Sequence, residues 1–139
     1  MIYGIGTDLI EIDRIRAAHG RFGERFVQRV LGPLEQEKYR KRRMRSEQRG
    51  DLFLATRFAA KEALSKALGL GMRQPMSWRA VEILNDASGR PVAVVSAPAL
   101  REFTEERGIR LHVSVSDERQ FAMAYAIAEV EEGARCSVR

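Results

Sequence analysis

Cysteine is almost absent from this chain of 139 residues, in which Cys136 is the only one. An intrachain disulfide is therefore excluded, which is typical of a reducing compartment. No apolar run approaches the roughly 18 residues that a membrane-spanning helix needs, and residues 1–6 lack the basic start and long apolar core of a signal peptide. We therefore expect a cytoplasmic protein without a membrane segment.

Several catalytic signatures are missing as well. The sequence contains no Ser-His-Asp spacing, no Cys-His zinc set and no glycine loop of the Walker type. Their absence disfavours acyl hydrolases, zinc enzymes and P-loop nucleotide enzymes. Gly4 and Gly6 lack the third glycine of a dinucleotide-binding fingerprint, so this pair is too weak a signal to use.

Positive charge is in excess. The formal net charge is +5 and the sequence pI is near 9.9, which favours anionic partners such as nucleic acid, nucleotides or an acidic protein. Seven cations crowd into residues 38–49. A run of this kind is more often a solvated face than an anion-binding patch. Charge alone leaves these alternatives open.

The length of the chain predicts one domain, over 1–130, and the periodicity of apolar residues predicts a mixture of strands and helices, an α+β fold. Gly20, Gly23 and Gly32-Pro33 mark the expected breaks among the first helices, and Asp13 is the expected cap of the first one. Residues 131–139 show no period and are expected to form a disordered tail. The predicted order is a strand over 1–11, a short helix after Asp13, helices over 34–43 and 51–70, strands over 79–84 and 91–96, a helix over 97–107, and strands over 109–116 and 121–130.

The most informative segment is the run over 57–69, which places a carboxylate and several cations among small and apolar residues. Phe58, Glu62, Lys66 and Gly69 share one helical face by their three-and-four spacing. A carboxylate one turn before a lysine can hold a metal and a phosphate together. On helix statistics alone, an exposed ion pair is the more common explanation.

Two other polar residues interrupt predicted strands. Asp8 lies on a face otherwise made of glycine and isoleucine, where an unpaired carboxylate would be costly. An aspartate satisfied by backbone donors or an arginine is nevertheless more common than a metal ligand. His112 alternates with Ser114 and Ser116, so we expect it to face a polar cavity or solvent. Taken singly, Asp8 favours a structural role, and His112 favours a structural or a surface role.

Three separated motifs resemble the holo-[acyl-carrier-protein] synthases, the short bacterial type of phosphopantetheinyl transferase. They are GIGTDLIEI over 4–12, RFAAKEALSKA over 57–67 and HVSVS over 112–116. The resemblance runs in order over 1–129 and implies the phosphopantetheinyl transferase fold, an antiparallel sheet packed against one long helix and shorter helices. The chain departs from its relatives at 69–71, where a threonine often stands between the two glycines.

This resemblance implies transfer of the phosphopantetheine moiety of coenzyme A to a serine of apo acyl carrier protein, with release of adenosine 3',5'-bisphosphate. Asp8 and Glu62 match the family's Mg²⁺ ligands. Lys66 would contact the diphosphate and stabilise the charge that develops on the leaving phosphate. Glu62 is also a candidate base, either directly or through a water on the metal, and these two routes stay open.

The other matches to the family are looser. Arg14 matches a position at the interface with the carrier protein, and Arg21 and Arg25 are plausible helpers, because acyl carrier proteins are strongly acidic. For the cationic run over 38–49 three alternatives stay open: it binds nucleotide phosphate, it binds the carrier protein, or it binds neither. The positions that match the coenzyme A site, besides Lys66, are Arg57, Gly69, Gly71, Asn85, Pro91 and His112.

The length of the chain carries a second inference. Longer transferases of the superfamily resemble two such domains fused around the site, so the resemblance implies a homo-oligomer, in this family a trimer with sites at subunit borders. The apolar alternation over 121–127 would supply the buried contact or belong to an ordinary core.

A small basic nucleic-acid-binding protein is the competing interpretation, supported by the pI and the cationic run. No recognised nucleic-acid motif appears, and Asp8 and Glu62 would have no role in such a protein, so we expect no nucleic-acid partner. The sequence leaves open whether a fatty acid, polyketide or peptide synthetase carrier is served. It also leaves open the choice between Mg²⁺ and Mn²⁺ and the tolerance for acyl-coenzyme A donors.

Overall fold

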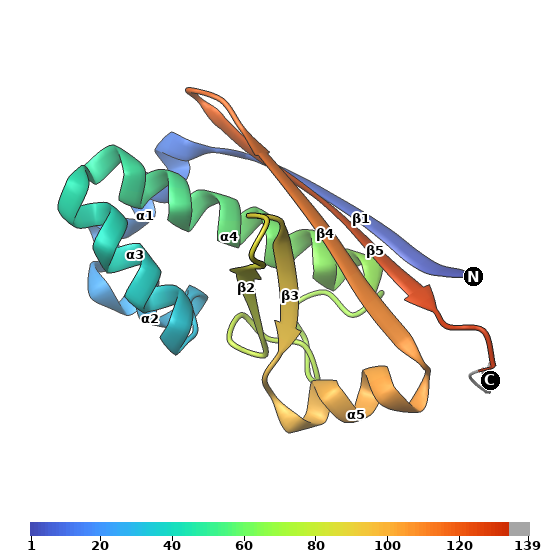
Figure 1. Cartoon of the computed structure of the whole chain (residues 1–139). Coiled ribbons are helices and arrows are strands. Elements are labelled where there is room, and N and C mark those ends of the chain that lie inside the picture. The colour runs from blue at the N-terminus through green and yellow to red at the C-terminus, as the bar shows by residue number, and fades with distance from the viewer. Residues whose placement is uncertain (134–139) are drawn as a thin grey trace.

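The computed structural model describes residues 1–133, so that Cys136 and most of the predicted tail lie outside the described residues. The architecture is α+β, as predicted (Figure 1). The elements in chain order are β1 (Ile2–Glu11), α1 (Ile12–Phe22), α2 (Glu24–Val30), α3 (Pro33–Arg45), α4 (Glu47–Ala67), β2 (Val81–Asn85), β3 (Pro91–Val95), α5 (Pro98–Glu106), β4 (Ile109–Asp117) and β5 (Phe121–Val130).

The strands β1, β5 and β4 form an antiparallel sheet with β5 in the centre, and α4 crosses one face of it (Figure 1). Small residues make up this inner face: β5 contributes buried alanines at alternate positions, and β1 contributes Gly4 and Gly6. A Cβ atom on Gly6 would collide with the carbonyl oxygen of Ala63, and one on Gly4 with that of Ala67. Glycine here lets α4 approach β1 closely.

The long helix α4 is buried along most of its length, because alanine and leucine cover the side that meets the sheet. It begins one turn earlier than predicted, since Ser46 is the cap and its Oγ accepts a hydrogen bond of 3.1 Å from the N–H of Arg49. Gly69 follows its end with φ 73°, which confirms the predicted stop.

The predicted hairpin is confirmed as β2 and β3, which pair antiparallel. Asp86 organises its turn, because Oδ1 accepts hydrogen bonds from the N–H groups of Ser88 and Arg90 at 2.9 and 3.0 Å. Gly89 has φ 88°, the left-handed conformation that the sequence predicts there. The turn extends toward α3 and α4 and so places Asn85 near the first half of the long helix.

The first three helices cluster at one end of the molecule (Figure 1) and differ from the prediction in three ways. The helix α1 passes through Gly20 and stops at Gly23. Asp13 does not cap it, because it lies in the first turn and pairs with Arg16 at 2.6 Å. The short α2 was not predicted, since the breaks at Gly23 and Gly32 leave too few residues for a clear helical period.

None of the described helices combines the length and the apolar composition that a membrane crossing requires. Large exposed apolar side chains gather instead on the sheet face that points away from α4, because side chains alternate between the two faces of a strand. We call this surface the outer sheet face. Its large apolar residues are Tyr3, Ile5, Leu9, Phe121, Met123, Tyr125 and Ile127.

Candidate active site

Two carboxylates and an ammonium group meet where β1 faces the last turns of α4. Asp8 follows Gly6 on the inner face of β1, and Lys66 extends toward it from α4. The Nζ of Lys66 donates a hydrogen bond of 2.8 Å to the carbonyl oxygen of Thr7 and lies 3.3 Å from Oδ1 of Asp8. Glu62 lies one turn before Lys66 on the same side of α4. The fold thus unites three residues that the sequence singled out, and we call them the carboxylate cluster.

Electrostatic coupling within the carboxylate cluster is visible at Glu62, which is half-buried. Burial raises the pKa of Glu62 above its ordinary value, and the charge of Asp8 raises it further, whereas Lys66 lowers it. Carboxylates that repel each other in a partly desolvated site favour a shared cation.

The donor set of the carboxylate cluster fits Mg²⁺. Within residues 1–133, no three His, Cys, Asp or Glu side chains converge as a ligand set for a metal. Mg²⁺ does not require such a set, because it commonly uses one or two carboxylates and completes its shell with water and substrate phosphate. Asp8 and Glu62 could supply those carboxylates. Lys66, whose side chain is 52% exposed, marks the open side through which phosphate oxygens would enter.

The coupling predicts opposite effects of two substitutions on the pKa of Glu62. Lys66→Met raises it, because burial and the charge of Asp8 are then unopposed, and Asp8→Asn lowers it, because a neighbouring negative charge is lost. The measurement is the carboxyl ¹³C shift of labelled glutamate against pH in metal-free protein. The same titration midpoint in the wild type and both variants would contradict this geometry.

A cavity of about 800 Å³ opens between α3, the start of α4 and the turn of the β2–β3 hairpin. We call it the basic pocket. Several cations of the run over 38–49 line it, so part of this run faces a hollow rather than open solvent. Positive charges gathered around a concave surface attract anions. Its lining residues are Lys38, Lys41, Arg42, Arg45, Arg49, Leu52, Asn85 and Gly89.

Arg57 reaches the edge of the basic pocket through Asn85, whose Oδ1 accepts a hydrogen bond of 3.1 Å from Nη2. Its guanidinium carbon lies 4.1 Å from the centre of the Phe53 ring. The Nε atom is buried and has no hydrogen-bond partner within residues 1–133. Burial lowers the pKa of Arg57 to about 10, although Glu35 opposes the shift. Pro91 pairs with Asn85 across the hairpin. Three predicted coenzyme A positions thus lie together.

Gly69 and Gly71 follow α4 with φ values of 73° and 63°. Their N–H groups donate to the carbonyl oxygens of Lys66 and Ser65 at 3.0 and 3.2 Å, which caps the helix. A contact between these N–H groups and a phosphate would have to replace those bonds. The assignment of the two glycines to the coenzyme A site therefore stays a prediction.

His112 does not join the carboxylate cluster within one chain. It lies opposite Ile127 on the outer sheet face, and its Nε2 is 2.8 Å from Oε2 of Glu129. Asp8 lies on the inner face of the same sheet, so the sheet itself separates the two residues. A site that used both would need His112 from a second copy of the chain.

The three predicted carrier-binding arginines lie on the helices at one end of the molecule. Arg14 is exposed on α1, and Arg21 lies 5.1 Å from the ring of Phe22. Arg25 borders a cavity of about 380 Å³, which we call the aromatic groove. Its lining residues are Phe22, Arg25, Phe26, Arg29, Val30, Phe58 and Trp78.

The aromatic groove was missed from the sequence because its walls come from α1, α2, α4 and the loop before β2. The rings of Phe58 and Trp78 stack with centroids 4.5 Å apart, and that of Phe26 lies 6.3 Å from Phe58. The one available signal was Phe58, which shares a helical face with Glu62. An apolar floor with arginines at its rim fits an acidic, amphipathic surface.

Three comparisons with known proteins indicate the same family. The family model described as the 4'-phosphopantetheinyl transferase superfamily matches residues 4–126. Over 129 residues, the chain is 57% identical to a holo-[acyl-carrier-protein] synthase of Herminiimonas arsenicoxydans, which covers 93% of this chain and 98% of the relative.

Solved structures agree with this result. The holo-[acyl-carrier-protein] synthase of Neisseria meningitidis is 41% identical with a TM-score of 0.84, over 93% of this chain and 99% of that one. The synthase of Bacillus anthracis, solved in complex with CoA (3',5'-ADP), is 33% identical with a TM-score of 0.78, over 94% and 99% of the two chains. The resemblance drawn from the three motifs is therefore confirmed. This chain belongs to the 4'-phosphopantetheinyl transferase superfamily and groups with its holo-[acyl-carrier-protein] synthases.

Proposed function

We propose that this protein transfers the phosphopantetheine moiety of coenzyme A to a serine of apo acyl carrier protein. The serine oxygen bonds to the phosphorus that carries the pantetheine arm, and the bond from that phosphorus to the bridging oxygen of the diphosphate breaks. Holo acyl carrier protein and adenosine 3',5'-bisphosphate are the products. The observation that supports this proposal most strongly is the carboxylate cluster of Asp8, Glu62 and Lys66, because the chain belongs to this family.

Each member of the carboxylate cluster has a chemical task in this reaction. Lys66 neutralises negative charge on the diphosphate as the bond to the leaving group breaks. Glu62, with its raised pKa, accepts the serine proton directly or through water. Mg²⁺ is the proposed cofactor, held by Asp8 and Glu62, and when bound it would supply further positive charge and orient the phosphate oxygens.

The adenosine end of coenzyme A is proposed to lie along the basic pocket. Coenzyme A is a polyanion, and the cations of that pocket would attract it. Asn85 lines the same pocket, where its side-chain amide would hydrogen-bond the adenine base. Arg57 supports Asn85 and carries the unpartnered buried Nε described above. Pro91 would border the same site. Gly69 and Gly71 would lie nearer the diphosphate.

Acyl carrier protein is proposed to dock on the end formed by α1 and α2. Arg14, Arg21 and Arg25 would face the acidic carrier, and the aromatic groove would take apolar side chains of the docking helix. Complementary charge of this kind speeds encounter and fixes orientation. The groove adjoins Glu62 through Phe58, which lies one turn earlier on α4. A carrier seated there would bring its serine toward the carboxylate cluster.

Charge reversal separates the two substrates. Arg14→Glu is expected to raise KM for acyl carrier protein about tenfold, because a contact to an acidic partner becomes repulsive. KM for coenzyme A should change by less than about twofold. Steady-state kinetics with each substrate varied in turn provides the measurement. Arg101→Glu on α5 is the matched control, since it changes net charge equally at a distant surface. Equal effects of Arg14→Glu on both substrates would refute the docking assignment.

We further propose a homotrimer with active sites at subunit interfaces. The outer sheet face exposes a contiguous row of large apolar side chains, which is typical of an interaction surface. His112 lies on this face, apart from the carboxylate cluster of its own chain. Trimer assembly would cover the apolar row and carry His112 toward a neighbour's coenzyme A site.

A charge on the central strand tests this assembly. Met123→Glu is expected to produce monomers in light scattering and to abolish most activity, because it buries an unpaired carboxylate at the proposed interface. Val94→Glu on β3 is the matched control, since Val94 is equally exposed at 43% but lies outside the outer sheet face. A fully active monomer would rule out shared sites.

Fatty acid biosynthesis in the cytoplasm is the proposed setting. Rates on apo carriers from fatty acid, polyketide and peptide synthetase systems, measured side by side, test this assignment. We expect the highest kcat/KM on the fatty acid carrier. Faster modification of a polyketide or peptide synthetase carrier would assign the enzyme to that pathway. The proposed reaction would stay the same.

A further inference from the structure

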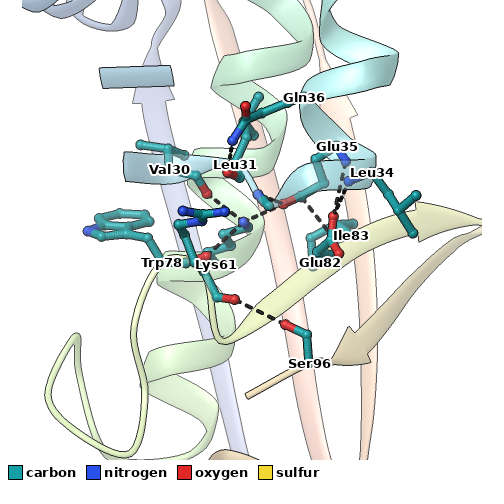
Figure 2. A network of polar contacts seen from close by, with 12 residues as sticks. Val30, Leu31, Leu34, Glu35, Gln36, Lys61, Trp78, Glu82, Ile83 and Ser96 are labelled. Carbon is teal, nitrogen blue, oxygen red and sulfur yellow. Dashed lines mark hydrogen bonds and ion pairs between the residues drawn. The ribbon is translucent and has the colours of Figure 1, made fainter. Parts of the chain in front are cut away.

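A buried ion pair lies next to the proposed catalytic residues and has no part in the reaction described above. Lys61 on α4 is fully buried, and its Nζ is 2.6 Å from Oε1 of Glu35. The same Nζ donates hydrogen bonds of 2.5 and 2.7 Å to the carbonyl oxygens of Val30 and Trp78 (Figure 2). An ammonium has three protons, so all its donors are used.

Glu35 is held just as firmly at the start of α3. Its Oε1 also accepts a hydrogen bond of 2.9 Å from the N–H of Gly32, and its Oε2 accepts one of 3.0 Å from the N–H of Ile83 on β2. Glu82 extends the network, because its Oε2 accepts the N–H groups of Leu34 and Glu35 at 2.9 and 3.0 Å (Figure 2). One point on α4 is thereby tied to α2, α3, β2 and the loop before β2.

Both backbone carbonyls that accept hydrogen bonds from Lys61 belong to residues that line the aromatic groove. Val30 ends α2, Trp78 lies on the loop before β2, and both residues line the groove. Phe58, which stacks on Trp78, precedes Lys61 by three residues on α4. Glu62 directly follows Lys61. The ammonium therefore ties two wall segments of the groove, the end of α2 and the loop before β2, to the helix that carries Glu62 and Lys66.

Fold stability alone does not account for this arrangement. An apolar pair of similar volume commonly replaces a buried ion pair without loss of stability, because removing two charges from water is costly. The ammonium supplies directed bonds to two otherwise separate backbone segments, which an apolar side chain cannot make. Two wall segments held in place lower the ordering cost of docking, since a preorganised surface loses less freedom on binding.

We propose that Lys61 is a positioning residue for acyl carrier protein, acting through the carbonyl groups of Val30 and Trp78. This role rests on the proposed function, because it concerns the groove in which the carrier would dock. It requires that loss of the ammonium loosens the groove without disturbing the coenzyme A site.

The test is the double variant K61M/E35Q, which removes both charges of the ion pair together, while the carboxylate of Glu82 keeps its hydrogen bonds from two backbone N–H groups of α3. We expect KM for acyl carrier protein to rise about tenfold, with KM for coenzyme A within about twofold of the wild type. Trp78 is the only tryptophan of the chain, so time-resolved fluorescence anisotropy reports directly on the groove. The variant should show added fast local motion at Trp78.

Glu35→Gln alone is the matched control: it costs stability, because the ammonium of Lys61 loses its counter-ion, but in the folded variant the bonds of Lys61 to both carbonyls remain. It should retain the wild-type KM for the carrier and the wild-type anisotropy. Unchanged carrier KM and unchanged anisotropy in folded K61M/E35Q would overturn the proposal. If that variant does not fold, Lys61→Arg provides the second test, since a planar guanidinium cannot reproduce the three ammonium bonds. Carrier KM and Trp78 motion should again rise together, and wild-type values would overturn the proposal.

Anisotropy is read without any substrate, which separates this inference from the reaction. A wild-type protein that modifies no carrier would contradict the proposed function. The comparison of Trp78 motion between the wild type, Glu35→Gln and K61M/E35Q would still decide whether Lys61 holds the groove.

Discussion

Glu62→Gln is expected to lower kcat/KM about 10³-fold, within the range that loss of a catalytic acid or base produces. The amide has nearly the same shape but cannot accept the serine proton, and it offers the proposed Mg²⁺ no charge. Single-turnover transfer to apo acyl carrier protein provides the measurement. Stability should be kept or increased, because the raised pKa shows that the folded protein disfavours the charge at Glu62.

Two further measurements separate this effect from a general loss of structure. The midpoint temperature of thermal unfolding of Glu62→Gln should equal or exceed that of the wild type, since repulsion by Asp8 is removed. Glu105→Gln, an exposed change of the same type on α5, should leave the rate unchanged. A Glu62→Gln enzyme within tenfold of wild-type activity would exclude Glu62 as both base and essential metal ligand.

Lys61→Met is expected to lower the free energy of unfolding by about 3–5 kcal/mol, the cost of leaving one partner of a buried ion pair uncompensated. The carboxylate of Glu35 would remain fully buried without its cation, and the carbonyl groups of Val30 and Trp78 would lose their donor. Urea denaturation at neutral pH provides the measurement, with the slope compared between proteins to verify a common mechanism of unfolding.

Addition of Glu35→Gln to Lys61→Met should recover most of this loss, because the stranded charge is removed. Lys41→Met is the control, since Lys41 is 76% exposed in a surface pair with Glu37 and should change stability by less than about 0.5 kcal/mol. A loss below about 1 kcal/mol for Lys61→Met would mean that Glu35 finds another partner or takes up a proton at little cost.

Most of the fold follows from local patterns. The strands that form the three-stranded sheet, the β2–β3 hairpin and α4 all have clear periods, and Gly69 and Gly89 have the positive φ that their turns require. The errors fall where local signals compete. Gly20 is a frequent helix terminator but here continues α1, and α2 is too short to show a period. The early start of α4 depends on Ser46, whose capping role is hidden among charged residues.

The site was predictable only in part. Asp8 and Glu62 are far apart in sequence, and neither shows a partner until Gly4 and Gly6 let β1 approach α4. The three family motifs supplied that connection before the structure did. Lys61 gave no signal of its burial, because its acceptors are a distant glutamate and two backbone carbonyls. Every residue carries a backbone carbonyl, so the sequence does not mark the two that accept hydrogen bonds from Lys61. The network behind the aromatic groove could therefore be found only in the folded structure.

The most direct test of the central claim is the intact mass of apo acyl carrier protein after incubation with this protein, coenzyme A and Mg²⁺. The account predicts a gain of one phosphopantetheinyl group within an incubation just long enough for the wild type, absent over that time with a chelator or with Glu62→Gln and retained with Glu105→Gln. An unchanged mass with folded wild-type protein, across carriers of fatty acid, polyketide and peptide synthetase systems, would contradict it.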